Sequence, residues 1–287
     1  MCCVAFFVAL ISCLLGCFLL SDVRLLISDK YGANCPHGGV NLYEMTAIIA
    51  FAKMDKLSYV INQSSGCEDI NKLWHNPGGL IHIAARYGQN DVVRFLLENG
   101  ADVNLSRDDG QTPLILALDN DHVETALYLL NHNADPTAKS ISVFTALSLA
   151  SARGLLPVVM YLTMLDAIDT DFVPPESPER YTALHYAIMN NQAGVVEYLC
   201  NLPTHKRPNV FAMAYIHYNQ GIQISMNALH LAAACTRCTD PRIFEALIKV
   251  GAMLIVSENE DVVVPYLYAM VSKNQTALHA LDNHKEF

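Results

Sequence analysis

The sequence predicts an all-α fold, a solenoid in which short helix–turn–helix units stack along one axis. The first observation is a repeated pattern: an apolar stretch rich in small residues begins near residues 46, 79, 112 and 145, at constant steps of 33. The second is a further apolar stretch with helical spacing, as Val92, Phe95 and Leu96 illustrate. The third is an apolar content of 52%, enough to bury a core. Self-similarity at a period of this length is typical of repeat architectures.

Residues 1–20 contain no charged side chain. In a helix, 20 residues span about 30 Å, the thickness of the hydrocarbon core of a bilayer. We therefore expect a hydrophobic membrane anchor here, followed by a linker over residues 21–43; the alternatives are a cleaved signal segment and a buried N-terminal helix. Arg24 and Lys30 follow the apolar stretch and no Lys or Arg precedes it, so the positive-inside rule predicts a repeat domain in the cytoplasm. If the segment is cleaved, the protein is secreted instead.

The repeat domain is expected over residues 44–287, with further units beginning near residues 182, 227 and 276. The steps to these starts are 37, 45 and 49, so the later units contain insertions. The first unit, residues 44–78, departs from the pattern and is expected to cap the array. Thr276 opens a helix, but the chain ends at Phe287 before a second helix could follow, so the last unit is expected to be incomplete.

Each unit carries local signals for where its helices begin and end. Thr112 is a residue type that caps helix N-termini, and Pro113 suits the first helical position, where no N–H is needed. Gly88 lies in a short polar turn between the two helices of its unit. Gly100 follows a second helix, where a left-handed backbone is needed to end it, and Asn133 takes that place once.

These segments resemble the ankyrin repeat, whose units open with Thr-Pro-Leu-His and close with Gly-Ala-Asp-Val-Asn. The clearest copies are Gly110-Gln-Thr-Pro-Leu114 and Gly100-Ala-Asp-Val-Asn104, and the resemblance extends over about residues 44–281. It implies β-turn fingers, the segments that join successive units and project to one side of the helices. It also implies a structural role for the histidine at the fourth position of a unit, which hydrogen-bonds the residue that caps the helix. These histidines are His82, His185, His230 and His279.

The chain is acidic, with 18 basic against 28 acidic residues and a net charge of −10. Nucleic-acid binding needs clustered Lys and Arg, so no nucleic-acid partner is expected. The sequence contains no glycine-rich phosphate loop, no nucleophile elbow and no zinc-protease motif. We therefore expect a protein that is not an enzyme, with no cofactor, metal or small-molecule substrate.

The nine cysteines have no regular spacing, which is unlike a disulfide framework and indicates reduced thiols. Cys235 and Cys238 form a C-x-x-C pair in the turn between the two helices of the unit at 227. Zinc sites of this kind use two such pairs, and the sequence has no second one. The two thiols are therefore interpreted as incidental; a weak metal or redox site with His230 nearby is the alternative.

The expected function is that of a protein-interaction scaffold or adaptor, because repeat arrays present an extended concave surface to another protein. Aligned across the units, the first-helix residues at the fifth and eighth positions of each unit are expected to face that surface. The expected binding residues are Ile83, Arg86, Leu116, Asp119, Leu149, Tyr186, Met189 and Leu231. One alternative is that the fingers cover these side chains. Two others are a recruitment fragment of a longer enzyme or channel, and a host-directed effector of an intracellular microbe.

Overall fold

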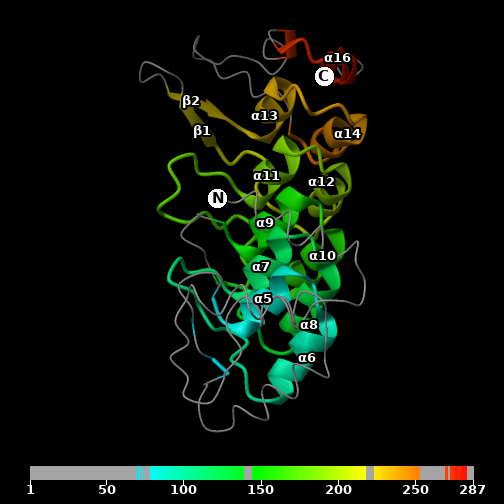
Figure 1. The fold of residues 1–287 in the computed structure, drawn as a ribbon. Helices are drawn as coiled ribbons and strands as arrows, with labels where there is room; N and C mark the ends of the chain where they lie inside the picture. The colour runs from blue at the N-terminus through cyan, green and yellow to red at the C-terminus, as the bar shows by residue number, and fades with distance from the viewer. Residues whose placement is uncertain are drawn as a thin grey trace, which may run out of the picture.

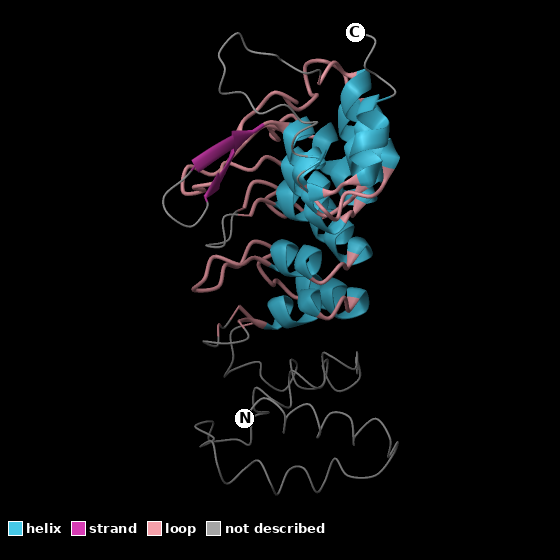
Figure 2. Cartoon of the chain, turned by 90° about the horizontal axis from the view of Figure 1, so that it is seen from above, coloured by secondary structure: helices cyan, strands magenta, loops and turns pink. Residues whose placement is uncertain are grey.

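The helices form pairs that stack into a column, and the chain follows this column from one end to the other (Figure 1). The computed structural model describes residues 70–71, 73, 78–138, 144–217, 223–252, 269–270 and 272–282. Within these ranges, first helices pack against first helices of neighbouring units, and second helices against second helices. The segments that join the units project to one side of the helices (Figure 2), so the expected solenoid with fingers is confirmed.

Five described helix pairs follow the expected units. The first helices are α5 (Leu80–Arg86), α7 (Pro113–Asp119), α9 (Ala146–Arg153), α11 (Ala183–Met189) and α13 (Ala228–Ala234). The second helices are α6 (Asn90–Glu98), α8 (Val123–Asn131), α10 (Leu156–Met164), α12 (Ala193–Cys200) and α14 (Pro241–Lys249). A further helix, α16 (Gln275–Asp282), lies at the C-terminal end of the column.

The first helices begin where the sequence predicts. Thr112 caps α7 by accepting a hydrogen bond from the backbone N–H of Ile115 (3.4 Å), and Pro113 occupies the first helical position. Thr145 and Thr182 cap α9 and α11 in the same way. Each such bond satisfies a backbone N–H that has no partner within the helix, which stabilises the helix by about 1 kcal/mol.

The core runs along the column between the two layers of helices. The alanine at the sixth position of each unit, counted from the residue that caps the first helix, is fully buried, because its small side chain lets neighbouring first helices approach closely. These residues are Ala84, Ala117, Ala150, Ala187 and Ala232. Leu96 and Leu114 are 0% and 1% exposed, as the sequence predicts. The periodic pattern therefore identified the side chains that hold neighbouring units together.

The turn between the two helices repeats from unit to unit. A residue with positive φ stands two positions before the second helix in four units. These residues are Gly88, Asp121, Gly154 and Asn191. The backbone N–H of the following residue then bonds to the sixth-position alanine, as that of His122 does to the carbonyl of Ala117 (2.9 Å).

The same turn shows that α16 is a second helix, so the predicted unit start at 276 is wrong. Lys273 has a φ of 57° two positions before α16, and the N–H of Asn274 bonds to the carbonyl of Ala269 (2.9 Å). Asn274 also caps the helix, and α16 packs against α14, the second helix of the preceding unit. Thr276 and His279 match the residue types that open a unit, although they lie inside this helix. Ala269 corresponds to the sixth-position alanine of the other units. Counting back five residues from it puts the unit start near residue 264, which lies outside the described residues.

The finger between α12 and α13 contains two strands that the sequence analysis did not expect. β1 (Ala214–His217) and β2 (Gln223–Met226) pair in an antiparallel sheet, with Ala214 opposite Met226 and Tyr215 opposite Ser225. The long insertion in this unit supplies enough residues for a hairpin. The part of the fold that the structure describes therefore includes a small sheet on the finger side, beside the helices.

Three expectations fall on residues that lie outside the described ranges. They are the anchor over residues 1–20, the linker over residues 21–43 and the unit that begins near residue 46. Among the helices that the structure does describe, none has the length and apolar character required to cross a membrane.

Candidate functional site

The predicted binding residues at the fifth position are buried, so this part of the prediction is wrong. Ile83, Leu116, Leu149 and Leu231 are between 1% and 7% exposed. The buried alanine beside each of them lets the first helices approach so closely that no gap is left for solvent. These four side chains therefore belong to the core and stabilise the stack.

The other four predicted residues reach the surface. Arg86 and Asp119 are exposed, and Tyr186 and Met189 are half-buried. Arg86, Asp119 and Met189 are the last residues of α5, α7 and α11, so they lie at the helix ends remote from the fingers. The carboxylate of Asp119 forms an ion pair with the guanidinium of Arg153 in the next unit, at a distance of 2.6 Å. Of the predicted set, Tyr186 alone has further aromatic rings around it within the described residues.

Tyr186 forms an aromatic cluster with Phe144 and Tyr181. The ring centroids of Phe144 and Tyr186 are 4.9 Å apart, and those of Tyr181 and Tyr186 are 5.5 Å apart with an edge-to-face arrangement. All three side chains are half-buried. Phe144 and Tyr181 each stand immediately before a capping threonine, Thr145 or Thr182, so they hold the same place in consecutive units. The cluster lies where the fingers join the first helices.

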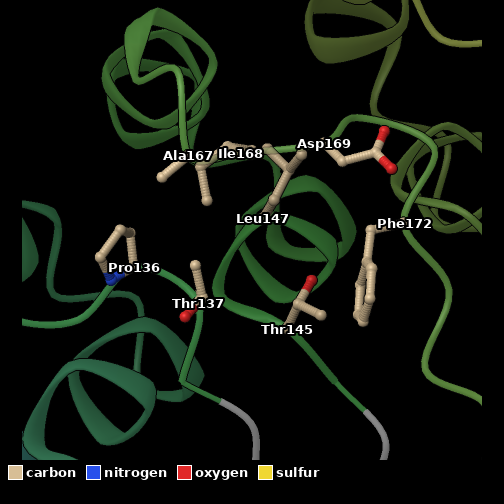
Figure 3. A pocket seen from close by; sticks show the side chains of 8 residues that line it. All are labelled: Pro136, Thr137, Thr145, Leu147, Ala167, Ile168, Asp169 and Phe172. Atoms are coloured by element: carbon tan, nitrogen blue, oxygen red, sulfur yellow. The ribbon is translucent and has the colours of Figure 1, made fainter.

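A pocket of about 240 Å³ opens next to this cluster, between two fingers. Figure 3 shows the residues that line it: Pro136 and Thr137 at the left, Ala167, Ile168 and Asp169 across the top with Leu147 beneath them, Thr145 at the bottom and Phe172 at the right. Phe172 is 39% exposed, a large value for an aromatic side chain. The lining is mostly apolar, with the carboxylate of Asp169 at one edge.

The pocket coincides with a gap in a row of hydrogen bonds between fingers. The side chain of Asn71 accepts from the backbone N–H of Asp102 (2.7 Å), and that of Asn104 accepts from the N–H of Asp135 (2.7 Å). Both asparagines also donate to a carbonyl of the following unit. Thr137 stands at the next equivalent position, and its bonds within the described residues go to Asp135 of its own finger. The shorter threonine leaves the space in which the pocket lies.

The finger over residues 165–181 is strongly acidic, with five acidic side chains and one basic side chain. Asp166 is paired with Lys206, whose Nζ lies 3.3 Å away and also donates to two carbonyls at the end of α10. Burial raises the pKa of the Asp171 carboxyl, which accepts a hydrogen bond from the next finger. Asp169 lies at the pocket and Glu179 lies near the aromatic cluster, so the surface around both features is negatively charged.

The signature histidines His82, His185 and His230 are structural, as the resemblance implied, whereas His279 lies inside the second helix α16. Nδ1 of His185 lies 2.8 Å from the hydroxyl of Thr182, and Nδ1 of His230 lies 2.7 Å from the side-chain oxygen of Asn227. His82 accepts a hydrogen bond from the backbone N–H at the start of its own helix. Burial lowers the pKa of both His82 and His185 to about 4, so both rings are neutral at pH 7.

Phe144, Tyr181 and Phe172 were not predicted from the sequence. A signal for the first two was available, because an aromatic residue directly before the capping threonine occurs in two consecutive units. Phe172 lies in an irregular finger, where no periodicity indicates which side chains face solvent. Phe172 was identified because its side chain lines the pocket.

Comparison with known families and structures agrees with this geometry. A family model described as ankyrin repeats (3 copies) matches residues 15–107 and 48–140, and a model of a single ankyrin repeat matches residues 179–210. The first match starts inside the apolar stretch 1–20 and includes the expected linker. The crystal structure of the human ASB11 ankyrin repeat domain superposes with a TM-score of 0.63 at 21% identity, covering 82% of this chain and 96% of that one.

Curated relatives match part of the array. Human BCL-6 corepressor-like protein 1 is 35% identical over 131 residues, which is 46% of this chain and 7% of that protein. A rice protein, probable E3 ubiquitin-protein ligase XBOS33, is 41% identical over 101 residues, 34% of this chain and 18% of the relative. The chain thus spans 7% and 18% of the lengths of these two relatives. The helix pairs and both family matches lead to one conclusion: this chain belongs to the ankyrin repeat family, whose domains serve protein–protein interaction.

Proposed function

We propose that this chain is a protein-interaction module whose finger side binds a segment of a partner protein that is apolar and basic. The observation that carries the proposal is the pocket beside the aromatic cluster, both within an acidic surround. Exposed apolar patches with polar rims are typical of protein-binding sites, and aromatic anchors contribute most of the binding energy there. The partner's apolar side chain would enter the pocket against Phe172.

The charges around the pocket indicate the chemistry of the partner. Asp169 lies at the pocket edge, and the remaining acidic residues of finger 165–181 are balanced by few basic ones. Opposite charges on a partner speed association and select against acidic competitors. We therefore expect Lys or Arg on either side of the apolar anchor, and an affinity that falls as salt is added.

Selection from a random peptide library on the full chain tests this proposal. We expect the enriched peptides to contain an aromatic or large aliphatic residue flanked by basic residues. Phe172→Ala should weaken the binding of a selected peptide roughly 5- to 30-fold, as aromatic anchors usually do. Tyr87→Ala is the matched control, because Tyr87 is 47% exposed but lies in the turn between α5 and α6.

Tyr186→Ala should weaken the same peptide and also lower the melting temperature, because Tyr186 packs on two rings. Phe172 is more exposed, so Phe172→Ala should leave the melting temperature nearly unchanged. Enriched peptides without basic residues would contradict the prediction that the acidic finger selects basic partners. Equal binding to wild type and Phe172→Ala would show that the pocket is not the site.

A second candidate role is substrate recruitment within a longer protein. It is favoured by the match to a rice relative whose name is that of a probable ubiquitin ligase, of which the match covers 18%. The nucleotide sequence beyond the present reading frame tests it. An in-frame continuation that encodes a catalytic domain supports recruitment, and an immediate run of stop codons contradicts it.

A further inference from the structure

The turn between α13 and α14 differs from its counterparts and carries two cysteines that the proposed function does not use. In the units that begin at 79, 112, 145 and 182, the second helix starts 11 residues after the capping residue. In the unit at 227 it starts 14 residues after the cap. The three additional residues allow an extra turn, which contains both Cys235 and Cys238.

The backbone holds the two cysteines at a distance that suits a disulfide. The N–H of Cys238 bonds to the carbonyl of Cys235 (3.3 Å), so the four residues form a hydrogen-bonded turn. The ends of such a turn lie within about 7 Å between Cα atoms, and disulfides span about 4.4–6.8 Å. Each thiol also shifts the pKa of the other. A disulfide between Cys235 and Cys238 therefore requires little backbone movement.

The two sulfurs have unequal surroundings. Cys235 is half-buried, so a small molecule reaches it, whereas Cys238 is fully buried and its Sγ donates to the carbonyl of Ile188 (2.9 Å). Interaction with the neighbouring Cys238 thiol, together with backbone N–H groups and the charge of Arg237, lowers the pKa of the Cys235 thiol to about 6. The Cys235 thiol and burial raise the pKa of Cys238. Among the described residues, Arg237 and Cys238 are the ionisable groups that act on Cys235.

A metal site fits this turn less well. No group of three or more potential metal ligands comes together among the described residues, and structural zinc needs four. His230, the nearby candidate in the sequence, uses Nδ1 to bond the cap of its own helix. Two thiols three residues apart in one hydrogen-bonded turn, with no third metal ligand beside them among the described residues, suit a redox pair better than a metal site.

We propose that Cys235 and Cys238 form a redox-active dithiol that reacts with low-molecular-weight disulfides such as oxidised glutathione. The thiolate of Cys235 attacks one sulfur of the small disulfide and expels one thiolate, which takes up a proton from water. Cys238 then loses its proton to solvent and attacks the Cys235 sulfur of the mixed disulfide, which expels the second small thiolate. Two protein thiols are thereby oxidised to one disulfide, and one small disulfide is reduced to two thiols.

The disulfide would form at a junction of three units. On one side, Asn191 accepts hydrogen bonds from the backbone N–H groups of Thr239 (3.1 Å) and Asp240 (3.3 Å). On the other side, Asn274 donates to the carbonyls of Cys235 (2.9 Å) and Cys238 (3.2 Å). Oxidation removes the bond from Cys238 to Ile188, so the redox state of the turn bears on the contact between neighbouring units.

Glutathione redox buffers test the proposal on the full chain. After equilibration and alkylation, peptide mass spectrometry should find Cys235 joined to Cys238 in oxidising buffer and both alkylated in reducing buffer. Cys238→Ser should trap glutathione on Cys235, whereas Cys235→Ser should leave the buried Cys238 unmodified. Cys200→Ser is the matched control and should change neither result, because Cys200 is buried and burial raises its pKa to about 12. Absence of the 235–238 disulfide, or pairing of Cys235 with another cysteine, would overturn the proposal.

The pH dependence of alkylation distinguishes a reactive thiol from an ordinary one. The iodoacetamide rate at Cys235 should be flat above about pH 7 and half-maximal near pH 6, following its thiolate fraction. An ordinary thiol, with a pKa near 8.5, reacts about tenfold faster per pH unit over the same range. A Cys235 rate that rises steadily to pH 8 would contradict the nucleophile's role. A mixed disulfide that persists in the wild type would contradict the role of Cys238.

Discussion

Gly88 and Gly100 share a left-handed backbone but differ in their surroundings. Their φ angles are +66° and +89°, a region that costs other residues about 1–2 kcal/mol. A Cβ on Gly88 would lie 2.5 Å from Nδ1 of His122, whereas no atom lies within 4 Å of a Cβ on Gly100. His122 in turn bonds to the carbonyl of Arg86 (3.0 Å). Gly88 is therefore required for two reasons, and Gly100 for one.

We expect Gly100→Ala to lower the free energy of unfolding by about 1–2 kcal/mol, from backbone strain alone. Gly88→Ala should cost at least about 1 kcal/mol more, because the ring of His122 must move and lose its hydrogen bond. Urea denaturation of the two variants beside the wild type measures the difference. Equal losses would mean that the ring moves aside without cost.

The neutral histidines predict a stability that depends on pH. Burial holds the pKa of His185 at about 4 in the folded chain, below the ordinary 6.5. The unfolded chain therefore takes up the proton first as the pH falls, so the stability present above pH 6.5 declines towards pH 4, by up to about 3 kcal/mol for each such histidine. Urea denaturation between pH 7.5 and 4.5 should show this decline. His185→Asn should reduce the slope, and His205→Gln, at an exposed residue, should not.

Among the connections between elements, the finger bridges differ between successive units. Asn104→Ala removes two hydrogen bonds to the next finger, at 2.7 and 3.1 Å, and should lower the free energy of unfolding by about 1 kcal/mol. Thr137→Ala, at the equivalent position one unit later, removes bonds within its own finger and should cost less. Urea denaturation compares them. A larger loss for Thr137→Ala would show that the bridges between fingers do not stabilise the array.

The helices that the sequence predicted correctly are those with local signals. Thr112, Thr145 and Thr182 each cap a helix because the residue and its neighbours suffice to specify the cap. The C-terminal unit was misplaced because Thr276-Ala-Leu-His279 carries the same local signal inside a second helix. Ala269, Lys273 and Asn274 hold the turn that sets the correct position, and this turn is recognised by hydrogen bonds that a sequence does not display.

The candidate site was predicted only in part, because exposure depends on how closely elements approach one another. Leu116 and Leu149 occupy the expected face of their helices, but the spacing between helices buries them. Tyr186 was predicted as a surface residue and is half-buried in the aromatic cluster. The pocket depends on the gap between two fingers, which no single segment of the sequence specifies.

For the whole molecule, membrane attachment through residues 1–20 remains a prediction of the sequence. It predicts that the full-length chain sediments with membranes and resists carbonate extraction, whereas residues 31–287 stay in the supernatant. Fractionation with detection of the N-terminal peptide by mass spectrometry makes the measurement. Release of the intact chain by carbonate would contradict the anchor, and would agree with the ankyrin match that starts at residue 15.

We expect the column to bend most easily beside Thr137. The helix layers remain packed across this joint, through α7 with α9 and α8 with α10, while no side-chain hydrogen bond joins these two fingers among the described residues. In a repeat array each unit contacts only its neighbours. When the array is deformed, most of the movement therefore occurs at the joint between units that has the fewest stabilising contacts. A ligand seated between these two fingers would act as a wedge at that joint. A small spreading of the fingers would then alter the curvature of the array, and the two ends of the molecule would shift relative to each other.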